Sequence, residues 1–255
     1  MDPVKIATWN VNGIRARQGQ LLDWLAAEQP DIVCLQELKA HIDQLPFELR
    51  DLEHDYAGYH GDKGYSGVGL LVRRSLVATP PVFTHPAFDF ERRVISAELD
   101  FGRGPVLTSS FYVPNGGKDY DAKIRFLTDM DAWAAAHMAA GQAILFCGDL
   151  NVARTDMDIH PRERKVNQVG ARPDERALIE RLLSRGLVDV GRTLHPHDDA
   201  LFTWWAPWRN LKQRNIGWRI DYVVASGALA AHAETCVVQR EYGTSDHGPV
   251  VATFA

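Results

Sequence analysis

The chain has 255 residues, 45% of them hydrophobic and 24% charged, so it can bury a sizeable core and is not expected to be disordered. Its formal net charge of −5 argues against a uniformly basic nucleic-acid binder. No uncharged apolar run has the length of a membrane span, and the N-terminal residues lack the pattern of a secretory signal. Cysteines are few and lie in apolar surroundings, which predicts reduced core thiols in a cytoplasmic protein.

The first part of the chain has a strand–helix–strand pattern. Residues 5–9 form a β-type run, residues 20–28 have apolar side chains at helical spacing, and residues 31–35 form a continuous apolar strand. Asn10 and Asn12 follow the first strand, and Glu37 follows the second. Alternate residues of a strand share a face, so Asn10 and Asn12 are expected to point the same way. The pattern is typical of α/β folds, which place their sites at strand ends.

The middle of the chain is richer in strands. Three are predicted at residues 64–72, 93–99 and 106–113, followed by a long helix at 119–140. A further buried strand at 143–147 leads to Asp149 and Asn151. These two residues repeat the spacing of Asn10 and Asn12, a weak indication of two similar halves.

The last part contains one more predicted helix, at residues 173–185. Strands are predicted at residues 202–205, 218–224, 235–240 and 249–254. Asp246 and His247 stand in a loop that Gly248 and Pro249 turn into the last strand. Because no linker or change of composition interrupts the chain, residues 1–255 are expected to form a single domain.

Basic residues are concentrated in two segments despite the negative net charge. Residues 201–219 contain no acid and carry Arg209, Lys212, Arg214 and Arg219. Residues 162–172 contain one acid, Glu163, and carry Arg162, Arg164, Lys165 and Arg172. An acidic protein can in this way present one positive face to phosphates.

Histidines outside the last loop are interpreted as structural. His195 and His197, beside Asp198 and Asp199, superficially resemble a metal cluster, but the segment is typical of a solvated loop. The others have no partner pattern in the sequence; they are His41, His54, His60, His85, His137, His160 and His232.

The polar residues at the strand ends suit phosphodiester chemistry when taken together, although each alone is more often structural. Glu37 with asparagine carbonyls supplies hard oxygen ligands, which Mg²⁺ prefers. Cleaving a phosphodiester also needs a positioned water and stabilisation of the developing charge. His247 can contact the phosphate, and Asp149 can orient or deprotonate the water. Three more side chains can hold phosphate oxygens or that water: Tyr112, Asn115 and Asn151.

Seven segments in sequence carry a resemblance to a known family. They are residues 9–15 (WNVNGIR), 35–39 (LQELK), 64–68 (GYSGV), 112–116 (YVPNG), 148–151 (GDLN), 217–222 (GWRIDY) and 245–247 (SDH). Each is weak alone, but in this order, over nearly the whole chain, they resemble the exonuclease III family of AP endonucleases. The segments 64–68 and 217–222 favour the DNA-repair branch over related metal-dependent phosphodiesterases.

The resemblance implies a four-layer α/β sandwich of two packed mixed sheets with helices outside. It places Asn10 and Glu37 at the Mg²⁺ site, with Asp246 as a further ligand and Mn²⁺ as a possible substitute ion. Asp149 becomes the general base or water-orienting residue with Asn151 beside it, and Tyr112 and Asn115 lie at the phosphate. Asp221, not the adjacent Asp246, becomes the partner of His247. We also assign residues to DNA binding (Arg15, Tyr65, Asn115, Lys118, Arg209, Lys212, Arg214) and to a lesion pocket (Trp204, Trp218).

Three positions depart from the pattern of the family. Asn12 stands where some relatives have Asp, which leaves one charge fewer near the metal. Lys118 stands where some relatives have an Arg that inserts into DNA, and it is less suited to stacking. Residues 170–173 (GARP) occupy a loop in which many members have a bulky apolar residue after the glycine.

The expected protein is thus a monomeric, Mg²⁺-dependent DNA repair nuclease acting on duplex DNA. It is expected to cleave 5′ to abasic sites and to trim blocked 3′ ends as an exonuclease, 3′-phosphatase or 3′-phosphodiesterase. One alternative is a small-molecule or lipid phosphodiesterase of the same fold, which the basic, tryptophan-rich segment 201–219 disfavours. The other is a DNA-binding module with a decayed centre, which the complete set of polar residues disfavours.

Overall fold

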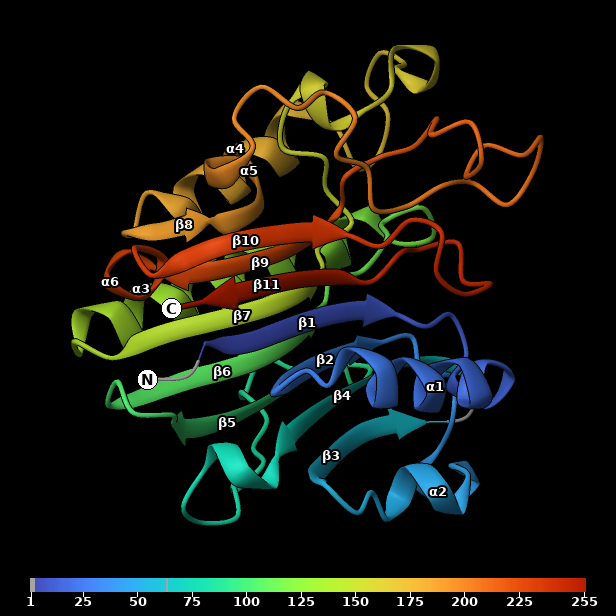
Figure 1. Cartoon of the computed structure of the whole chain (residues 1–255). Coiled ribbons are helices and arrows are strands. Elements are labelled where there is room, and N and C mark those ends of the chain that lie inside the picture. Colours follow the sequence, from blue (N-terminus) through green and yellow to red (C-terminus); the bar gives the residue numbers. More distant parts are fainter. Residues whose placement is uncertain (1–2, 63) are drawn as a thin grey trace.

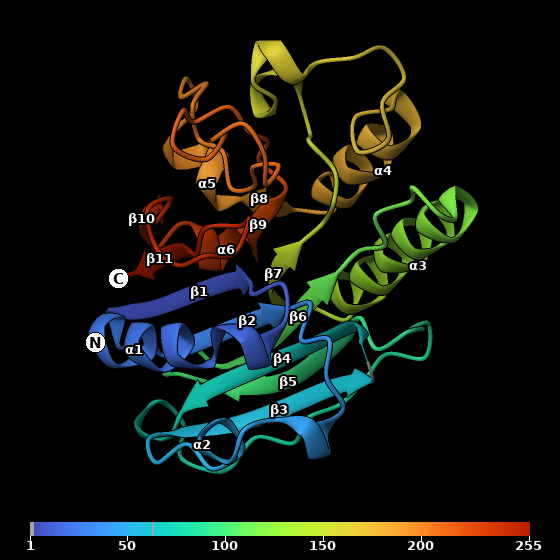
Figure 2. The ribbon, with the colours of Figure 1, turned by 90° about the vertical axis from the view of Figure 1, so that its right-hand side faces the viewer.

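Two mixed β-sheets pack face to face, with helices on the outer face of each (Figures 1 and 2). The structure is a computed structural model that describes residues 3–62 and 64–255. Met1 and Asp2, part of the N-terminal segment considered above, lie outside the described residues. The arrangement confirms the expected four-layer α/β sandwich.

The larger sheet has the strand order β10-β11-β1-β2-β4-β3, and the smaller sheet has the order β5-β6-β7-β9-β8. The larger sheet contains β1 (Val4–Asn10), β2 (Ile32–Gln36), β3 (Asp55–Asp62), β4 (Tyr65–Arg73), β10 (Ala233–Val238) and β11 (Val250–Phe254). The smaller contains β5 (Val94–Asp100), β6 (Pro105–Tyr112), β7 (Ala143–Asp149), β8 (Leu187–Asp189) and β9 (Asp221–Ser226).

Two pairs of helices cover the opposite outer faces of the sandwich. Helices α1 (Gln18–Glu28) and α2 (Phe47–Arg50) lie on the larger sheet, and α3 (Tyr120–Ala139) and α4 (Pro173–Leu183) lie on the smaller. Short helices α5 (Val190–Leu194) and α6 (Gly227–Ala230) flank β8 and β9. No helix in the described part combines the length and hydrophobicity of a membrane span.

The continuous apolar runs of β2 and β7 follow from burial on both faces. In β2, Cys34 points into the core between the sheets, while Val33 and Leu35 pack under α1 and α2. In β7, Leu145 points between the sheets and Phe146 packs under α3 and α4. A strand covered on both sides has no polar face, which is why alternation is missing from these segments.

The sheets repeat one topology, but not with the match that the asparagine spacing indicated. The order β11-β1-β2-β4-β3 has the same strand directions as β5-β6-β7-β9-β8, with a single parallel pair in each. Strand β1 therefore corresponds to β6, and β2 to β7. Asp149, at the end of β7, accordingly matches the end of β2 near Glu37 and not Asn10.

Asn12 and Asn151 lie beyond the ends of their strands, with φ of 47° and 51°. The backbone N–H of Asn12 donates to Asn10 Oδ1 (3.0 Å), and that of Asn151 donates to Asp149 Oδ1 (2.9 Å). Asparagine tolerates this left-handed conformation better than most residues. The expectation that Asn10 and Asn12 share a strand face was wrong, because the chain turns after Asn10.

Two further expectations about strands differ from the structure. Residues 202–205 and 218–220 form only isolated bridges, in which Trp204 pairs with Trp218 and with His247, and Trp218 also pairs with Ile159. Strand β9 begins at Asp221. Aromatic residues favour strands locally, but here they wall a cleft. Edge strands β3 and β8 were not predicted, because β3 is only partly buried and has no apolar run, and β8 has only three residues.

Candidate active site

The predicted functional side chains meet at the edge of the sheets toward which β1 points in Figure 1. The carboxyl ends of the two parallel pairs, β1/β2 and β6/β7, reach this edge, as do the amino ends of β9 and β11. Asn10 ends β1, Glu37 follows β2, Tyr112 ends β6, Asp149 ends β7, Asp221 begins β9, and His247 precedes β11.

Glu37 is held by three donors from three different segments. Its Oε1 accepts from Asn10 Nδ2 (3.0 Å) and Tyr112 Oη (2.9 Å), and its Oε2 lies 2.6 Å from Lys39 Nζ. Burial alone would raise the pKa of Glu37, but the hydrogen bonds from Asn10 and Lys39 outweigh it and lower the pKa. Glu37 is therefore an ionised carboxylate, with its position fixed. Lys39 lies in one of the family-like segments, but its position in the sequence gave it no role.

His247 is paired with Asp221, as the resemblance implied. Its Nδ1 lies 2.9 Å from Asp221 Oδ2, and its Nε2 lies 3.8 Å from Asp149 Oδ2. Burial by itself would lower the pKa of His247, but the charge of Asp221 and its hydrogen bond raise the pKa to about 10. His247 is thus a buried imidazolium, able to donate a hydrogen bond toward the cleft.

Asp149 lies between Glu37 and His247, and Asn10 Nδ2 donates to its Oδ2 at 2.9 Å. Burial is the main reason why the pKa of Asp149 is raised to about 7; the charge of His247 opposes the rise, and Asp221 and Glu37 add to it. The site therefore carries more carboxylates than neighbouring cations can offset. A carboxylate with a raised pKa in a cleft is typical of a residue that handles protons or binds a cation.

The carboxylates fit a hard divalent cation. Donor atoms of Glu37, Asp149 and His247 lie within 4.8 Å of one another. Because His247 is protonated, the two carboxylates are the groups suited to a metal, and such oxygen donors suit Mg²⁺ and Mn²⁺ better than zinc. A cation between them would also offset the excess negative charge.

Asn10 and Asp246 are differently placed from these two carboxylates. Asn10 Oδ1 accepts from the Asn12 backbone, so its NH₂ group faces Glu37 and Asp149. Asp246 accepts from Asn12 Nδ2 (2.8 Å) and Trp204 Nε1 (2.9 Å) and lies outside the group just described. Ligation by Asn10 and by Asp246 stays a prediction.

A cleft of about 420 Å³ opens directly over these groups. Trp204 and Trp218 form one wall, with their rings perpendicular at 6.3 Å between centroids. Gly170 lies against Trp218, since a Cβ on this glycine would come within 3.2 Å of the indole ring. Asn115 and Asn151 line the cleft and are joined by a hydrogen bond of 3.2 Å. The cleft therefore combines an apolar wall with a charged floor.

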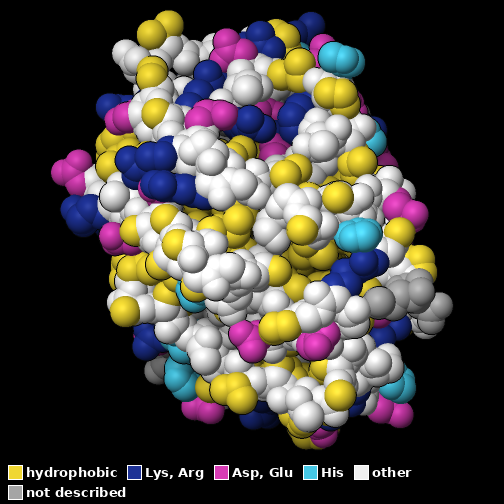
Figure 3. All heavy atoms as spheres, turned by 90° about the vertical axis from the view of Figure 1, so that its left-hand side faces the viewer, with side chains coloured by type: hydrophobic (Ala, Val, Ile, Leu, Met, Phe, Trp, Pro, Cys, Tyr) yellow, Lys and Arg dark blue, Asp and Glu magenta, His cyan; other side chains and the backbone are white. Residues whose placement is uncertain are grey.

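The basic residues predicted to contact DNA have different surroundings. Arg209 and Arg214 are exposed on the loop beyond Trp208, itself an exposed residue at the rim of the cleft. Lys212 donates to the carbonyls of Tyr242 (3.3 Å) and Ser245 (2.9 Å), and so holds the loop that carries Asp246. On the opposite side of the molecule, Lys and Arg side chains lie among Asp and Glu side chains (Figure 3).

Arg219 was wrongly counted with the exposed basic segment. Its guanidinium is buried and donates to Asp189 (2.8 and 2.9 Å) and to Asp158 (2.6 Å). Arg192 donates to the same Asp158 oxygen at 2.7 Å. Arg219 therefore anchors the start of β9, two residues before Asp221, and does not face the solvent.

The remaining DNA-contact predictions lie on the surface around the strand ends. Arg15 and Lys118 are exposed. Tyr65 is exposed and its hydroxyl accepts from Arg93 at 2.9 Å. The sequence did not single out Arg93, yet its guanidinium is buried 4.7 Å from the centre of the Tyr112 ring. Arg93 stands at the start of a predicted strand, where nothing in the sequence indicates burial.

Comparison with known proteins identifies the family. Residues 7–247 match the model of the Endonuclease/Exonuclease/phosphatase family. The chain belongs to this family. It is 32% identical to an exodeoxyribonuclease of Bacillus subtilis over 97% of this chain and 98% of that protein. It is 33% identical to the DNA repair nuclease APEX1 of Danio rerio, over 99% of this chain and 82% of the relative.

Solved structures agree with this assignment. An AP endonuclease from Archaeoglobus fulgidus superimposes with a TM-score of 0.87 at 29% identity, over 98% of this chain and 99% of the other. A 3′ phosphatase from Neisseria, solved with a product DNA hairpin, gives a TM-score of 0.88 at 31% identity, covering 99% of both chains. The protein is thus a hydrolase of the exonuclease III class of nucleases.

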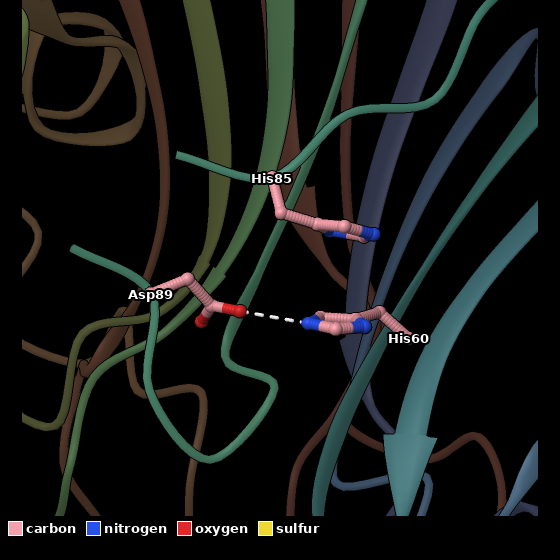
Figure 4. Close-up of side chains that lie close together, drawn as sticks. All are labelled: His60, His85 and Asp89. Carbon is pink, nitrogen blue, oxygen red and sulfur yellow. Dashed lines mark hydrogen bonds and ion pairs between the residues drawn. The ribbon is translucent and has the colours of Figure 1, made fainter. Parts of the chain in front are cut away.

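A second group of ligand-type side chains lies away from this centre (Figure 4). His60 Nε2 is 2.7 Å from Asp89 Oδ2, and the ring of His85 stacks on that of His60 at 3.7 Å. Imidazoles bind metals in the plane of the ring, so two stacked, nearly parallel rings do not direct their nitrogens at one ion. The structural interpretation of both histidines stays a prediction, and the sequence gave no sign of the Asp89 partner.

Proposed function

We propose that the protein is a Mg²⁺-dependent DNA repair nuclease that hydrolyses the phosphodiester 5′ to an abasic site in duplex DNA. The products are a 3′-hydroxyl and a 5′ deoxyribose phosphate. One observation carries the proposal: a floor of carboxylates and an imidazolium lies directly beneath a cleft walled by Trp204 and Trp218. A charged floor suits a phosphodiester, and an apolar wall suits a sugar that has lost its base.

Each residue has a role that its contacts support. His247 donates from Nε2 to a phosphate oxygen, while Asp221 holds the other ring nitrogen and keeps the imidazole charged. Asp149 orients the attacking water and accepts its proton. Asn115 and Asn151 hold phosphate oxygens or the water from the side of the cleft that they line.

The metal is assigned to Glu37, with Asn10 and Asp246 as further ligands in the assembled site. When bound, Mg²⁺ neutralises charge that develops on the phosphate oxygens. Tyr112 donates to Glu37 and thereby sets the position of this carboxylate at the phosphate side of the cleft. Mn²⁺ has the same preference for oxygen ligands and is the expected substitute.

Trimming of blocked 3′ ends is proposed as a companion activity. The same centre cleaves the same type of bond in a 3′-phosphate, a 3′-phosphodiester or the last nucleotide. The likeness to a 3′ phosphatase and to a 3′-5′ exonuclease of Neisseria, each 31% identical, favours this addition. The protein is proposed to act as a monomer and as a single domain spanning residues 1–255.

The decisive experiment incubates the protein with duplex DNA that contains one abasic site. Incision at the 5′ side of the lesion is expected with Mg²⁺ or Mn²⁺, and none with EDTA. Asp149→Asn protein, purified in parallel, controls for a contaminating nuclease. Hydrolysis of a phospholipid or small phosphodiester without incision of DNA would overturn the proposal in favour of the alternative phosphodiesterase.

A further inference from the structure

A buried ion pair lies where α3 and α4 begin, beneath the cleft. Lys123 Nζ and Glu175 Oε1 are 2.5 Å apart, and both side chains are completely buried. A buried ion pair is often no more stabilising than an apolar pair of the same volume. A cation near the start of a helix also opposes the helix dipole. The placement of Lys123 therefore calls for an explanation other than the stability of α3.

The other contacts of Lys123 supply one explanation. Its ammonium donates to the backbone carbonyls of Asn151 (2.7 Å) and Asn115 (3.2 Å). These residues follow β7 and β6, line the cleft, and are hydrogen-bonded through their side chains. Asn151 is also bound to Asp149 through its backbone N–H. An ammonium has three donors, so Lys123 has one for each of these carbonyls and one for Glu175.

Glu175 holds a third loop. Its carboxylate accepts from the backbone N–H of Gly170 (2.8 and 3.0 Å) and of Arg172 (2.9 Å). The Gly170 carbonyl accepts from Ala153, and a Cβ on Gly170 would come within 3.2 Å of the Trp218 ring. The carboxylate therefore fixes the backbone that packs against the tryptophan wall.

We propose that Lys123 and Glu175 are positioning residues that align the phosphate side and the pocket side of the cleft with each other. Lys123 sets the loops of Asn115 and Asn151, and Glu175 sets the loop of Gly170 beside Trp218. The ion pair between them fixes the spacing of the two sides. The expected effects on kcat and KM rest on the proposed function, whereas the alignment of the loops is a property of the fold.

The two ends of the pair act on different kinetic quantities. Lys123→Met is expected to lower kcat by about ten- to a hundredfold with little change in KM, because a displacement of about 1 Å near reacting groups costs up to about 10²-fold. Glu175→Gln is expected chiefly to raise KM for abasic DNA and to reduce the preference for abasic over intact nucleotides. A merely structural pair would not divide its effects in this way.

The double variant Lys123→Met/Glu175→Met separates positioning from stability. Replacing both charges leaves no unpaired buried ion, so the melting temperature is expected to be higher than that of either single variant. Catalysis is not expected to recover, since the carbonyls of Asn115 and Asn151 and the N–H of Gly170 still lack their partners. A folded double variant with wild-type kcat and KM overturns the proposal.

Asp131→Asn is the matched control. Asp131 is buried in α3 and binds Arg181 (2.8 Å) and Arg185 (3.1 Å) at the far end of α4, away from the cleft. This variant is expected to lose stability while keeping kcat and KM per folded molecule. If Lys123→Met and Glu175→Gln lose activity only in proportion to their unfolded fraction, as the control does, positioning is excluded.

Hydrogen–deuterium exchange provides a readout that does not depend on the reaction. Segments 113–118, 150–153 and 168–172 are expected to exchange faster in the Lys123 and Glu175 variants than in wild type or Asp131→Asn. If wild-type protein fails to cut abasic DNA, the proposed function fails while the exchange result still stands. Unchanged exchange in all three segments would show that Lys123 and Glu175 do not align the two sides of the cleft. If the double variant does not fold, Lys123→Arg replaces it in the measurements of kcat, KM and exchange.

Discussion

Two buried charged clusters meet the chain at Arg219 and Asp221, just before and at the start of β9, and they differ in how their charges are balanced. Arg219 belongs to the first, in which arginines and aspartates pair directly. Its guanidinium binds Asp158 and Asp189, and Arg192 adds a second cation at Asp158. The Asp221 cluster, in contrast, sets the carboxylates of Glu37, Asp149, Asp221 and Asp246 against two cations, His247 and Lys39.

The difference is visible in two aspartates that are both buried. Burial would raise the pKa of either one, but at Asp158 the charge and hydrogen bonds of Arg219 and Arg192 outweigh it and lower the pKa to about 2. At Asp149 burial prevails, with further help from Asp221 and Glu37, and the pKa rises to about 7. Direct pairing of charges stabilises the fold, whereas excess negative charge in a cleft is typical of a site that binds a cation.

The largest expected effect comes from the Asp221 cluster, in which carboxylates outnumber cations. Asp149→Asn is expected to lower kcat on abasic duplex DNA by about 10²–10⁴-fold, the usual contribution of a general base. Binding of DNA and the melting temperature are expected to be retained, because His247 keeps its closer partner Asp221 at 2.9 Å. His247→Asn and Asp221→Asn are expected to lower kcat to a similar extent. The double variant is expected to lose no more activity than either single variant, because the two residues act as one unit. Equal loss of binding and turnover in Asp149→Asn would mark this residue as structural.

The cluster around Arg219, in which arginines and aspartates pair directly, is expected to affect stability instead. Asp158→Asn leaves Arg219 and Arg192 short of charge and is expected to cost roughly 3–5 kcal/mol in the free energy of unfolding. Because the pKa of Asp158 is lowered from 3.8 to about 2, its contribution is fully present above pH 3.8 and is lost as pH falls toward 2. Denaturant unfolding at several pH values tests this, with the gap between variant and wild type closing in acid. A constant gap would contradict the assignment.

Replacement of Glu37 tests whether the Asp221 cluster binds the metal. Glu37→Ala is expected to lose most activity at low Mg²⁺ and to recover part of it at high Mg²⁺, because Asp149, Asp246 and substrate oxygens remain. A Mg²⁺ titration of incision rate measures the shift. An activity curve that superimposes on that of the wild type would remove Glu37 from the metal site.

Trp218 tests the wall of the cleft while leaving both charged clusters unchanged. Trp218→Ala is expected to impair abasic incision and to relax discrimination against intact nucleotides, since the apolar wall is lost. The buried indole also contributes to the core, so a loss of roughly 3–5 kcal/mol in stability accompanies the change. Rates are therefore compared per folded molecule. Wild-type values for both incision and discrimination would move the pocket toward Ala171 and Arg172.

The smallest effects are expected at the exposed arginines. If Arg209 and Arg214 contact phosphates, the logarithm of the binding constant falls with the logarithm of salt concentration. Each Arg→Ala change is expected to reduce the slope by about 0.9 on duplex DNA. Binding by fluorescence anisotropy over a salt series measures this. Slopes unchanged in both variants would place DNA on another surface.

The sequence predicted the parts of the fold that leave a local pattern. The apolar runs of β2 and β7 are visible because both faces are covered, and the polar residues that follow them mark the candidate site. Strand β3 left no such pattern, since an edge strand needs no apolar face. The aromatic residues around Trp204 suggested a strand because their packing against a cleft cannot be distinguished locally from packing in a sheet.

It was harder to predict which side chains pair with each other than which residues lie at the candidate site. His247 and Asp221 are 26 residues apart in the chain, and only the resemblance selected this pair over the adjacent Asp246. Arg219 looks like any exposed arginine in the sequence, because its partners come from β8 and from the loop after β7. Lys123 and Glu175 likewise have ordinary helical surroundings. Burial of a charge depends on which segments meet, which no local pattern records.

The repeated topology has a consequence for how the protein loses activity. One sheet supplies Asn10, Glu37 and His247, and the other supplies Asp149 and Asp221. The candidate active site therefore lies where the two sheets meet. A small slip of one half against the other separates Glu37 from Asp149 while every strand keeps its own hydrogen bonds. Catalysis is therefore expected to fail before secondary structure does when the protein is gently warmed or perturbed, which makes activity the more sensitive gauge of sheet alignment.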